Sequence, residues 1–194
     1  MKKKIILCTI ACVICFMIGL FIPNGIRLAL TDNNSFYIND TAIVVENNTN
    51  KGVVNQYVEN IKKMPKDLLK NCNTIVFTSE NLNNKFKLGF SKNVLAVTVE
   101  DVIYINDSKY KSNVVIHELF HVYDYKNNWI SLNDEKFNKI YETESEIISV
   151  SPGNNQNKQE FFATIGEEYF CNQEDLLKNS KPSYQYINNI LDSN

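Results

Sequence analysis

The sequence is poor in the residues that mark two common classes of functional site. Its formal net charge is only −2, and it has no basic stripe and no aromatic–glycine pattern, so we expect no nucleic-acid partner. Of its five cysteines, only Cys72 and Cys171 lie outside the apolar amino-terminal run. These two are too few and too far apart for a zinc cluster, although they could form one disulfide. Histidine is scarcer still, with two among 194 residues, a length sufficient for one domain with its own core.

Charge is absent from the amino-terminal segment beyond its first residues. Lys2 to Lys4 precede an apolar run of 18 residues, from Ile5 to Ile22, which is long for a signal peptide and just long enough to span a membrane. The positions that follow offer poor sites for signal peptidase, so we favour an uncleaved anchor over a removed signal peptide for residues 1–22. Because the lysines keep the short end in the cytoplasm, the rest of the chain is expected outside it.

Beyond this segment we expect a polar linker, residues 23–35, and one domain, residues 36–194. A period of two predicts strands and a period of 3.6 predicts helices. The expected strands cover residues 36–45, 74–78 and 94–105, the last turning at Glu100 and Asp101, while residues 81–91 are expected to be a loop or hairpin. The expected helices cover residues 51–69, 114–125, 134–148 and 158–170, and a last helix starts at Lys181. Pro65 kinks or ends the first of these. Ser112 is a candidate N-cap for the second, which Asn127 ends. Strands followed by helices indicate an α+β domain.

Both histidines lie in one motif, His117-Glu118-Leu119-Phe120-His121. On a helix, residues four apart share a face, so both imidazoles can bind one metal ion. A catalytic zinc site usually has three protein ligands and leaves a fourth position for water. Glu118 lies between the histidines, where it can act as the general base that takes a proton from that water. The motif therefore predicts a zinc hydrolase site.

The third zinc ligand must come from elsewhere, and with no histidine left we expect a carboxylate. Glu142, Glu144 and Glu146 follow His121 by 21 to 25 residues, and Glu160 follows it by 39. Spacing leaves both regions open. The first can equally be a solvated helix face, and Glu160 can be a first-turn residue that the helix dipole favours.

Asp124 lies on the same helical face as the histidines, three residues after His121. Its carboxylate could orient a ligand imidazole or bond to a neighbouring loop. The alternative is an exposed aspartate at the end of a helix, and position alone favours neither.

Three segments resemble the anthrax lethal factor-like metalloproteases, a family that includes the secreted clostridial Pro-Pro endopeptidases. Residues 117–124, HELFHVYD, resemble the family's active-site helix. Residues 159–163, QEFFA, are similar to its E-F-F-A segment, and residues 181–188, KPSYQYIN, are similar to its terminal helix. The three motifs occur in the family's order, and the resemblance covers about residues 70–194.

The resemblance implies a zinc site made of His117, His121 and Glu160, with Glu118 as the base, which makes Glu160 the expected third ligand. It also implies an α+β, zincin-like metalloprotease domain over residues 36–194. In that fold a small amino-terminal mixed sheet with the active-site helix precedes a helical carboxyl-terminal half. Substrate is expected along an edge strand drawn from residues 94–105.

The sequence departs from the family pattern at three positions. Phe120 stands where the family usually has glycine, and is expected to crowd the helix against the sheet or to fill a pocket. Thr164 stands where a second acid often follows the ligand glutamate. Gly153 stands where the family carries a tyrosine that stabilises the oxyanion, and without such a donor we expect a rate loss of about 10²–10³.

These observations predict an exported zinc-dependent endopeptidase that acts on a protein or peptide substrate and is held at the membrane if residues 1–22 are not cleaved. Two alternatives remain open. One is a zinc-binding module of the same family that binds a protein partner with little or no proteolysis, which the missing tyrosine favours. The other is an exported zinc amidase that acts on cell-wall peptides.

Overall fold

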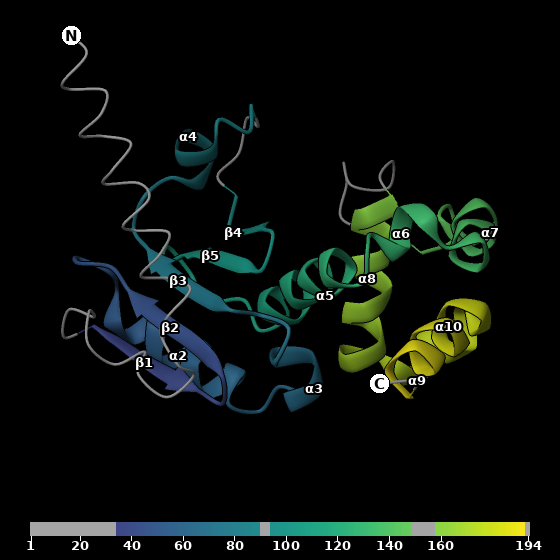
Figure 1. Ribbon diagram of the computed structural model, residues 1–194, viewed down its shortest axis with the longest axis horizontal. Coiled ribbons are helices and arrows are strands. Elements are labelled where there is room, and N and C mark those ends of the chain that lie inside the picture. Colours follow the sequence, from purple (N-terminus) through teal and green to yellow (C-terminus); the bar gives the residue numbers. More distant parts are fainter. Residues whose placement is uncertain (1–33, 90–93, 149–157, 193–194) are drawn as a thin grey trace, which may run out of the picture. The chain divides into compact units, whose positions relative to one another are not determined.

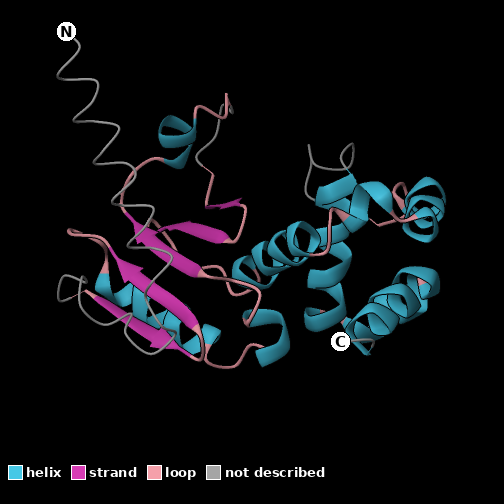
Figure 2. Cartoon of the chain, in the orientation of Figure 1, coloured by secondary structure: helices cyan, strands magenta, loops and turns pink. Residues whose placement is uncertain are grey.

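A five-stranded mixed sheet forms the first part of the chain in the computed structural model, which describes residues 34–89, 94–148 and 158–192 (Figures 1 and 2). Its strands are β1 (Ser35–Ile38), β2 (Thr41–Val45), β3 (Thr74–Thr78), β4 (Ala96–Val99) and β5 (Val102–Asn106). Their order is β1-β2-β3-β5-β4, in which β2, β3 and β5 are parallel and the two edge strands, β1 and β4, are antiparallel to their neighbours. The mixed sheet that the sequence predicts is therefore present.

Two tight hairpins form the edges of the sheet. The prediction of one strand over residues 36–45 is wrong, because Asn39 adopts a left-handed conformation, φ 52°, and turns the chain back between β1 and β2. Asparagine tolerates this conformation better than most residues. The predicted turn between β4 and β5 is confirmed, with Glu100 at φ 57°.

Nine helices accompany the sheet in the described residues. They are α2 (Lys51–Ile61), α3 (Lys66–Leu69), α4 (Leu82–Phe86), α5 (Val114–Lys126), α6 (Ile130–Asn133), α7 (Glu135–Glu144), α8 (Lys158–Cys171), α9 (Gln173–Asn179) and α10 (Lys181–Asp192). The break at Pro65 is confirmed. Within the loop or hairpin expected over residues 81–91, Leu82–Phe86 form the short helix α4, which Asn81 caps by accepting from the N–H of Asn84. Helix α7 also ends earlier than predicted, at Glu144.

The hydrophobic core lies on one face of the sheet, where α2 and α5 pack. Alternate residues of the three central strands point to this face and are fully buried: Ile43, Ile75, Phe77, Ile103 and Ile105. From α2, the ring of Tyr57 lies 5.7 Å from that of Phe77. Helix α4 lies on the opposite face, because Phe86 packs against Tyr104, the neighbour of Ile103 in β5. Alternation along each strand thus separates the face that carries α5 from the other.

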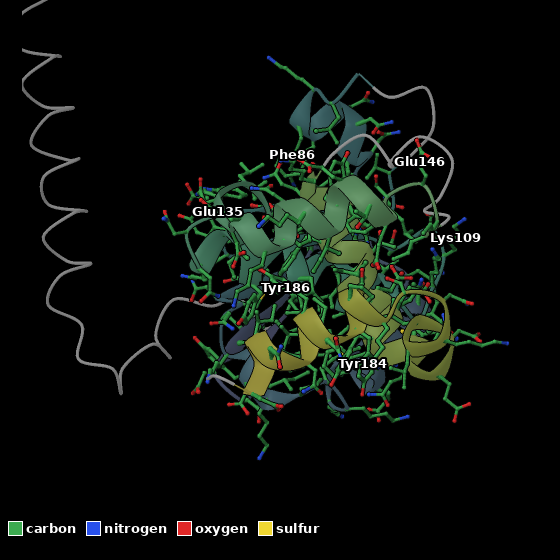
Figure 3. The ribbon with its side chains drawn as sticks, turned by 90° about the vertical axis from the view of Figure 1, so that its right-hand side faces the viewer. Phe86, Lys109, Glu135, Glu146, Tyr184 and Tyr186 are labelled. Atoms are coloured by element: carbon green, nitrogen blue, oxygen red, sulfur yellow. The ribbon has the colours of Figure 1, made fainter. Side chains whose placement is uncertain are left out.

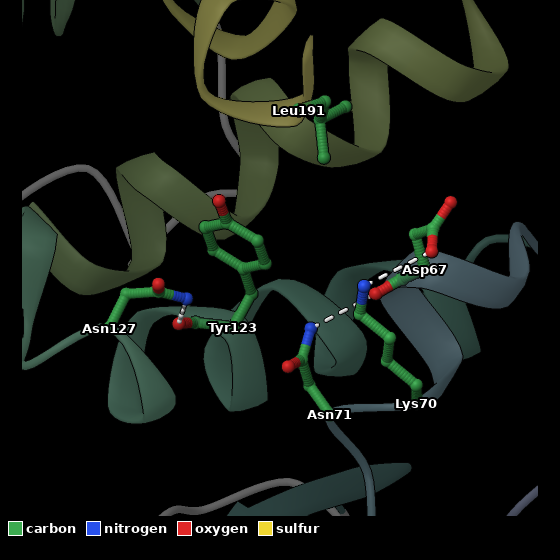
Figure 4. Close-up of a pocket in the computed structure, with 6 residues that line it drawn as sticks. All are labelled: Asp67, Lys70, Asn71, Tyr123, Asn127 and Leu191. Carbon is green, nitrogen blue, oxygen red and sulfur yellow. Dashed lines mark hydrogen bonds and ion pairs between the residues drawn. The ribbon is translucent and has the colours of Figure 1, made fainter. Parts of the chain in front are cut away.

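Helix α5 is held at several points around its circumference. At its end, Lys126 forms an ion pair of 2.7 Å with Asp101 in the β4–β5 turn. A small pocket separates α5 from α3 and α10; its lining residues are Asp67, Lys70, Asn71, Tyr123, Asn127 and Leu191 (Figure 4). The Tyr123 hydroxyl donates to the carbonyl oxygen of Ile190 in α10 at 3.0 Å. Since Tyr123 lies two residues, about 200°, from His121 on the helix, this pocket is on the side away from the histidines.

Helix α10 completes the carboxyl-terminal half by packing on α7 and α8. Figure 3 shows Tyr184 and Tyr186 along this helix. The ring of Tyr186 lies 5.6 Å from that of Phe137 in α7, and the ring of Tyr184 lies 5.2 Å from that of Tyr169 in α8. The predicted helical half after the sheet is therefore confirmed.

Two further expectations concern the amino-terminal segment and the two cysteines outside it. Within residues 34–89, 94–148 and 158–192, no helix is long and apolar enough to cross a membrane. The predicted signal or anchor, residues 1–22, and nearly all of the predicted linker lie outside the described residues. Cys72 is buried, Cys171 is exposed, and the two do not form a disulfide.

Candidate metal centre

Helices α5 and α8 bring three potential metal ligands together. His117 and His121 lie one turn apart on α5, and Glu160 lies in the first turn of α8. The Glu160 carboxylate is 3.3 Å from Nε2 of His117 and 3.5 Å from Nε2 of His121. One ligand atom from each residue lies within 4.8 Å of the others. The structure thus juxtaposes the three residues that the sequence predicts as ligands.

The geometry of this group fits a zinc ion. With bonds of about 2.0–2.1 Å to a tetrahedral zinc, two ligand atoms lie about 3.3 Å apart. The two nitrogen–oxygen distances are close to that value. Two imidazoles and one carboxylate also form a donor set that suits zinc, and three protein ligands leave one position open. His117, His121 and Glu160 can therefore hold zinc with little rearrangement.

The other side of the His117 ring is held by an acid that the sequence analysis missed. Glu167, two turns after Glu160 on α8, lies 3.0 Å from Nδ1 of His117. It also accepts a short hydrogen bond from the side-chain amide of Asn113, the residue before α5. A carboxylate on Nδ1 fixes the tautomer and leaves Nε2 for a metal. Glu167 is therefore placed to orient His117 towards a metal.

Burial and charge act in opposite directions on these groups in the metal-free protein. Burial disfavours the imidazolium of His117, but its hydrogen bonds to Glu160 and Glu167 outweigh burial and raise the pKa of His117 to about 10. Burial likewise tends to raise the pKa of both carboxyl groups, yet the same hydrogen bonds hold the pKa of Glu160 and of Glu167 below its usual range. Without metal, the protonated His117 therefore pairs with the ionised carboxylates of Glu160 and Glu167.

Glu118 points from α5 towards the edge of the sheet. Its carboxylate oxygen Oε2 accepts a hydrogen bond of 2.6 Å from the hydroxyl of Thr98 in β4. The residue is only 8 % exposed. It lies beside His117 in the chain and is held by the edge strand that the resemblance assigns to substrate.

Of the competing carboxylates, Glu144 has other partners. Glu144 is buried at the end of α7, where its carboxylate accepts from the hydroxyls of Ser180 and Ser183 and from the backbone N–H of Ser183 at the start of α10. Its neighbours Glu142 and Glu146 are exposed. Since an acid at a helix start satisfies unpaired N–H groups, Glu144 acts as a cap for α10. It does not join the histidines.

Asp124 is neither exposed nor bonded to a histidine in the described structure. It is fully buried and accepts hydrogen bonds from the backbone N–H of Ser131 at 2.8 Å and from the Ser131 hydroxyl at 2.5 Å. Burial raises its pKa although these bonds oppose the rise. Of the roles considered for Asp124, the bond to a neighbouring segment is the one observed, and the exposed helix-end aspartate is wrong.

Phe120 fills the space left by a glycine on the facing helix. Its ring is fully buried, and a Cβ atom placed on Gly166 of α8 would lie 2.3 Å from that ring. The ring also contacts Phe162 of α8, with centroids 5.8 Å apart. The chain thus places its large side chain on α5 and its glycine on α8. Phe120 fills a gap between the helices and does not crowd α5 against the sheet.

An oxyanion donor is not identified in the described residues. Gly153, at the expected tyrosine position, lies outside them. Tyr141, the nearest upstream tyrosine, packs on Phe161 with ring centroids 5.4 Å apart. The expectation of a weakened oxyanion site therefore stays a prediction.

The fold resembles that of a known peptidase. The structure of the Pro-Pro endopeptidase PPEP-2 from Paenibacillus alvei is similar with a TM-score of 0.61 and 18 % sequence identity, over 76 % of this chain and 96 % of that chain. Neither a family profile nor a curated protein matches the sequence. At this identity the likeness establishes the fold, and membership of the lethal factor-like family stays a prediction.

Proposed function

We propose that this chain is a zinc-dependent endopeptidase. The observation that carries the proposal is the cluster of His117, His121 and Glu160, with Glu118 beside it on the same helix. The likeness of the fold to a Pro-Pro endopeptidase supports a peptide as the substrate. The edge strand β4 borders the site and offers a place for an extended chain.

Each polar group has a role in this reaction. His117, His121 and Glu160 would hold the metal, and Glu167 would orient His117. A zinc ion held there would lower the pKa of a water molecule and polarise the scissile carbonyl. Glu118 takes a proton from the attacking water as the water oxygen bonds to the carbonyl carbon. When the carbon–nitrogen bond breaks, Glu118 passes the proton to the leaving amine, which regenerates the carboxylate.

We propose that the reaction takes place outside the cytoplasm. The support is the sequence of residues 1–22, in which lysines precede an apolar run of 18 residues. In this proposal the segment either tethers the enzyme to the membrane or is removed after export.

Cleavage of a peptide library that includes proline-rich peptides tests the function. With zinc supplied, the wild-type chain cleaves some peptides, and a chelator stops the reaction until zinc is restored. Glu118→Ala lowers the rate by about 10²–10⁴, because a general base is lost, while it binds as much zinc. Glu142→Ala, a change at an exposed glutamate of α7, is the matched control and leaves the rate unchanged.

The same experiment separates the alternatives. Stoichiometric zinc without cleavage of any peptide would support the binding module, which the glycine at position 153 favours. Cleavage confined to cell-wall peptides would support the amidase. Full activity of Glu118→Ala would contradict the mechanism proposed here.

A further inference from the structure

The hydrogen bond between Thr98 and Glu118 joins the edge strand to the proposed general base. The Thr98 hydroxyl lies 2.6 Å from Oε2 of Glu118 and 3.3 Å from the Glu118 backbone oxygen. A hydroxyl carries one proton, so the shorter contact is the bond that it donates. Among the described residues, no other hydrogen bond engages the Glu118 carboxylate. One of its oxygens is therefore fixed and the other is left to accept a proton.

The backbone of Thr98 faces the open side of the sheet. In the β4–β5 hairpin, Val99 and Val102 close a two-residue turn and form the first hydrogen-bonded pair. The bond from the N–H of Asn106 to the carbonyl of Leu95, 2.8 Å, belongs to the same alternating series. Thr98 pairs with Ile103 between these bonded pairs, so its N–H and C=O point away from β5. They are available to a peptide that lies along β4.

We infer that Thr98 is a positioning residue: its hydroxyl orients the Glu118 carboxylate, while its backbone offers the adjacent edge to the substrate peptide. The inference rests on the proposed function and adds a residue that no motif marks. The ion pair between Asp101 and Lys126 supports it, because that contact is a second link between the hairpin and α5. Thr98 thereby contacts both the backbone of the peptide and the carboxylate of Glu118, so the position of the peptide along β4 is fixed relative to the base.

Thr98→Val and Thr98→Ser test this role on the full chain. Valine matches the shape of threonine and favours strands but removes the donor, so kcat falls by about 10–100-fold, the usual loss when an orienting partner is removed. KM changes little, since the backbone of residue 98 is unchanged. Thr98→Ser keeps the hydroxyl and recovers most of kcat. Zinc content and thermal unfolding are measured for each variant, and both are expected to match the wild type.

Crystal structures of the zinc-bound variants give a second result that does not depend on activity. Glu118 keeps its place in Thr98→Ser and leaves it in Thr98→Val. An unchanged Glu118 in Thr98→Val, or an equal loss of kcat in both variants, would overturn the inference. If the wild type binds zinc but cleaves no peptide, the proposed function fails. The position of Glu118 in the two crystals still decides whether Thr98 holds it.

Discussion

Helices α5 and α8 meet on two sides that differ in chemistry. On one side His117 and His121 face Glu160, and Glu167 lies behind the first histidine. On the other side the ring of Phe120 lies on the bare backbone of Gly166. The polar side depends on charge and on what is bound, whereas the apolar side depends only on shape. Both sides join the same two helices.

The difference shows which side fixes the site. Buried charges cost free energy unless they are paired, so the polar side stabilises the protein only while a proton or a metal balances it. Close packing on the apolar side holds the helices together under all these conditions. We therefore expect changes on the polar side to alter metal binding, and changes on the apolar side to alter stability first.

Removal of the third ligand, on the polar side, is expected to have the largest effect, a loss of zinc affinity. Structural zinc sites with four ligands bind with about 10–16 kcal/mol, so Glu160→Gln should weaken zinc binding by on the order of 3 kcal/mol, more than 100-fold. Competition with a chromogenic chelator measures the affinity. Glu144→Gln is the control, because it alters a buried glutamate that caps α10. A larger loss of zinc affinity in the control would show that the ligand has been misassigned.

The next largest effect is expected from a methyl group added on the apolar side, which lowers stability. Gly166→Ala places a Cβ atom 2.3 Å from the Phe120 ring, and overpacking of this kind costs about 1–3 kcal/mol of unfolding free energy. Denaturant unfolding of the chelated protein measures the loss. In the double variant with Phe120→Ala, space for the methyl group exists, so the two losses should not add. Simple additivity would mean that the two side chains do not meet.

Loss of the acid behind His117 is expected to have a smaller effect. Glu167→Gln keeps the shape but removes the carboxylate from Nδ1, and such changes lower zinc affinity by about 10–100-fold. Glu168→Gln, one residue further on the same helix, serves as the control in the same titration. Equal affinities for the two variants would contradict the role given to Glu167.

The last expected effect is a pH dependence that only the metal-free protein shows. The pKa of His117 is raised to about 10, so the stability that its protonated form supplies is present in full below about pH 6.5 and is lost as the pH rises towards 10. The pKa of Glu160 is lowered, so its contribution is present above about pH 4.5 and is lost as the pH falls. Melting temperatures of the chelated protein should therefore decline above neutral pH. Since zinc replaces the proton, the zinc-bound protein should show no such decline in this range.

The sequence allowed most of the framework of this site to be predicted. Strand β3 has the predicted bounds, and the helix with the two histidines differs from its prediction by one residue. These segments have a strong period and clear turn residues at their ends. Helix α4 was missed because five residues are too few to show a period, and its cap at Asn81 looks like any loop asparagine.

The parts of the site that depend on tertiary contacts were not predictable in the same way. Glu167 stands beside Glu168 and resembles a surface residue; its only sequence signal is that it follows Glu160 by two helical turns and so shares its face. Asn113, and not the predicted Ser112, precedes α5, and its side chain bonds to Glu167 of α8 instead of capping its own helix. Neither pairing can be read without knowing that α8 lies against α5.

The contact between Phe120 and Gly166 also affects the distance between the two helices that carry the metal ligands. The thickness of one aromatic ring on a bare backbone sets how far the ligand of α8 stands from the ligands of α5. An added methyl group must push the ring away by about 1 Å, since carbon atoms rest about 3.5 Å apart, whereas zinc sites hold their bond lengths to within about 0.2 Å. A position that touches no ligand therefore contributes to the spacing of the ligands.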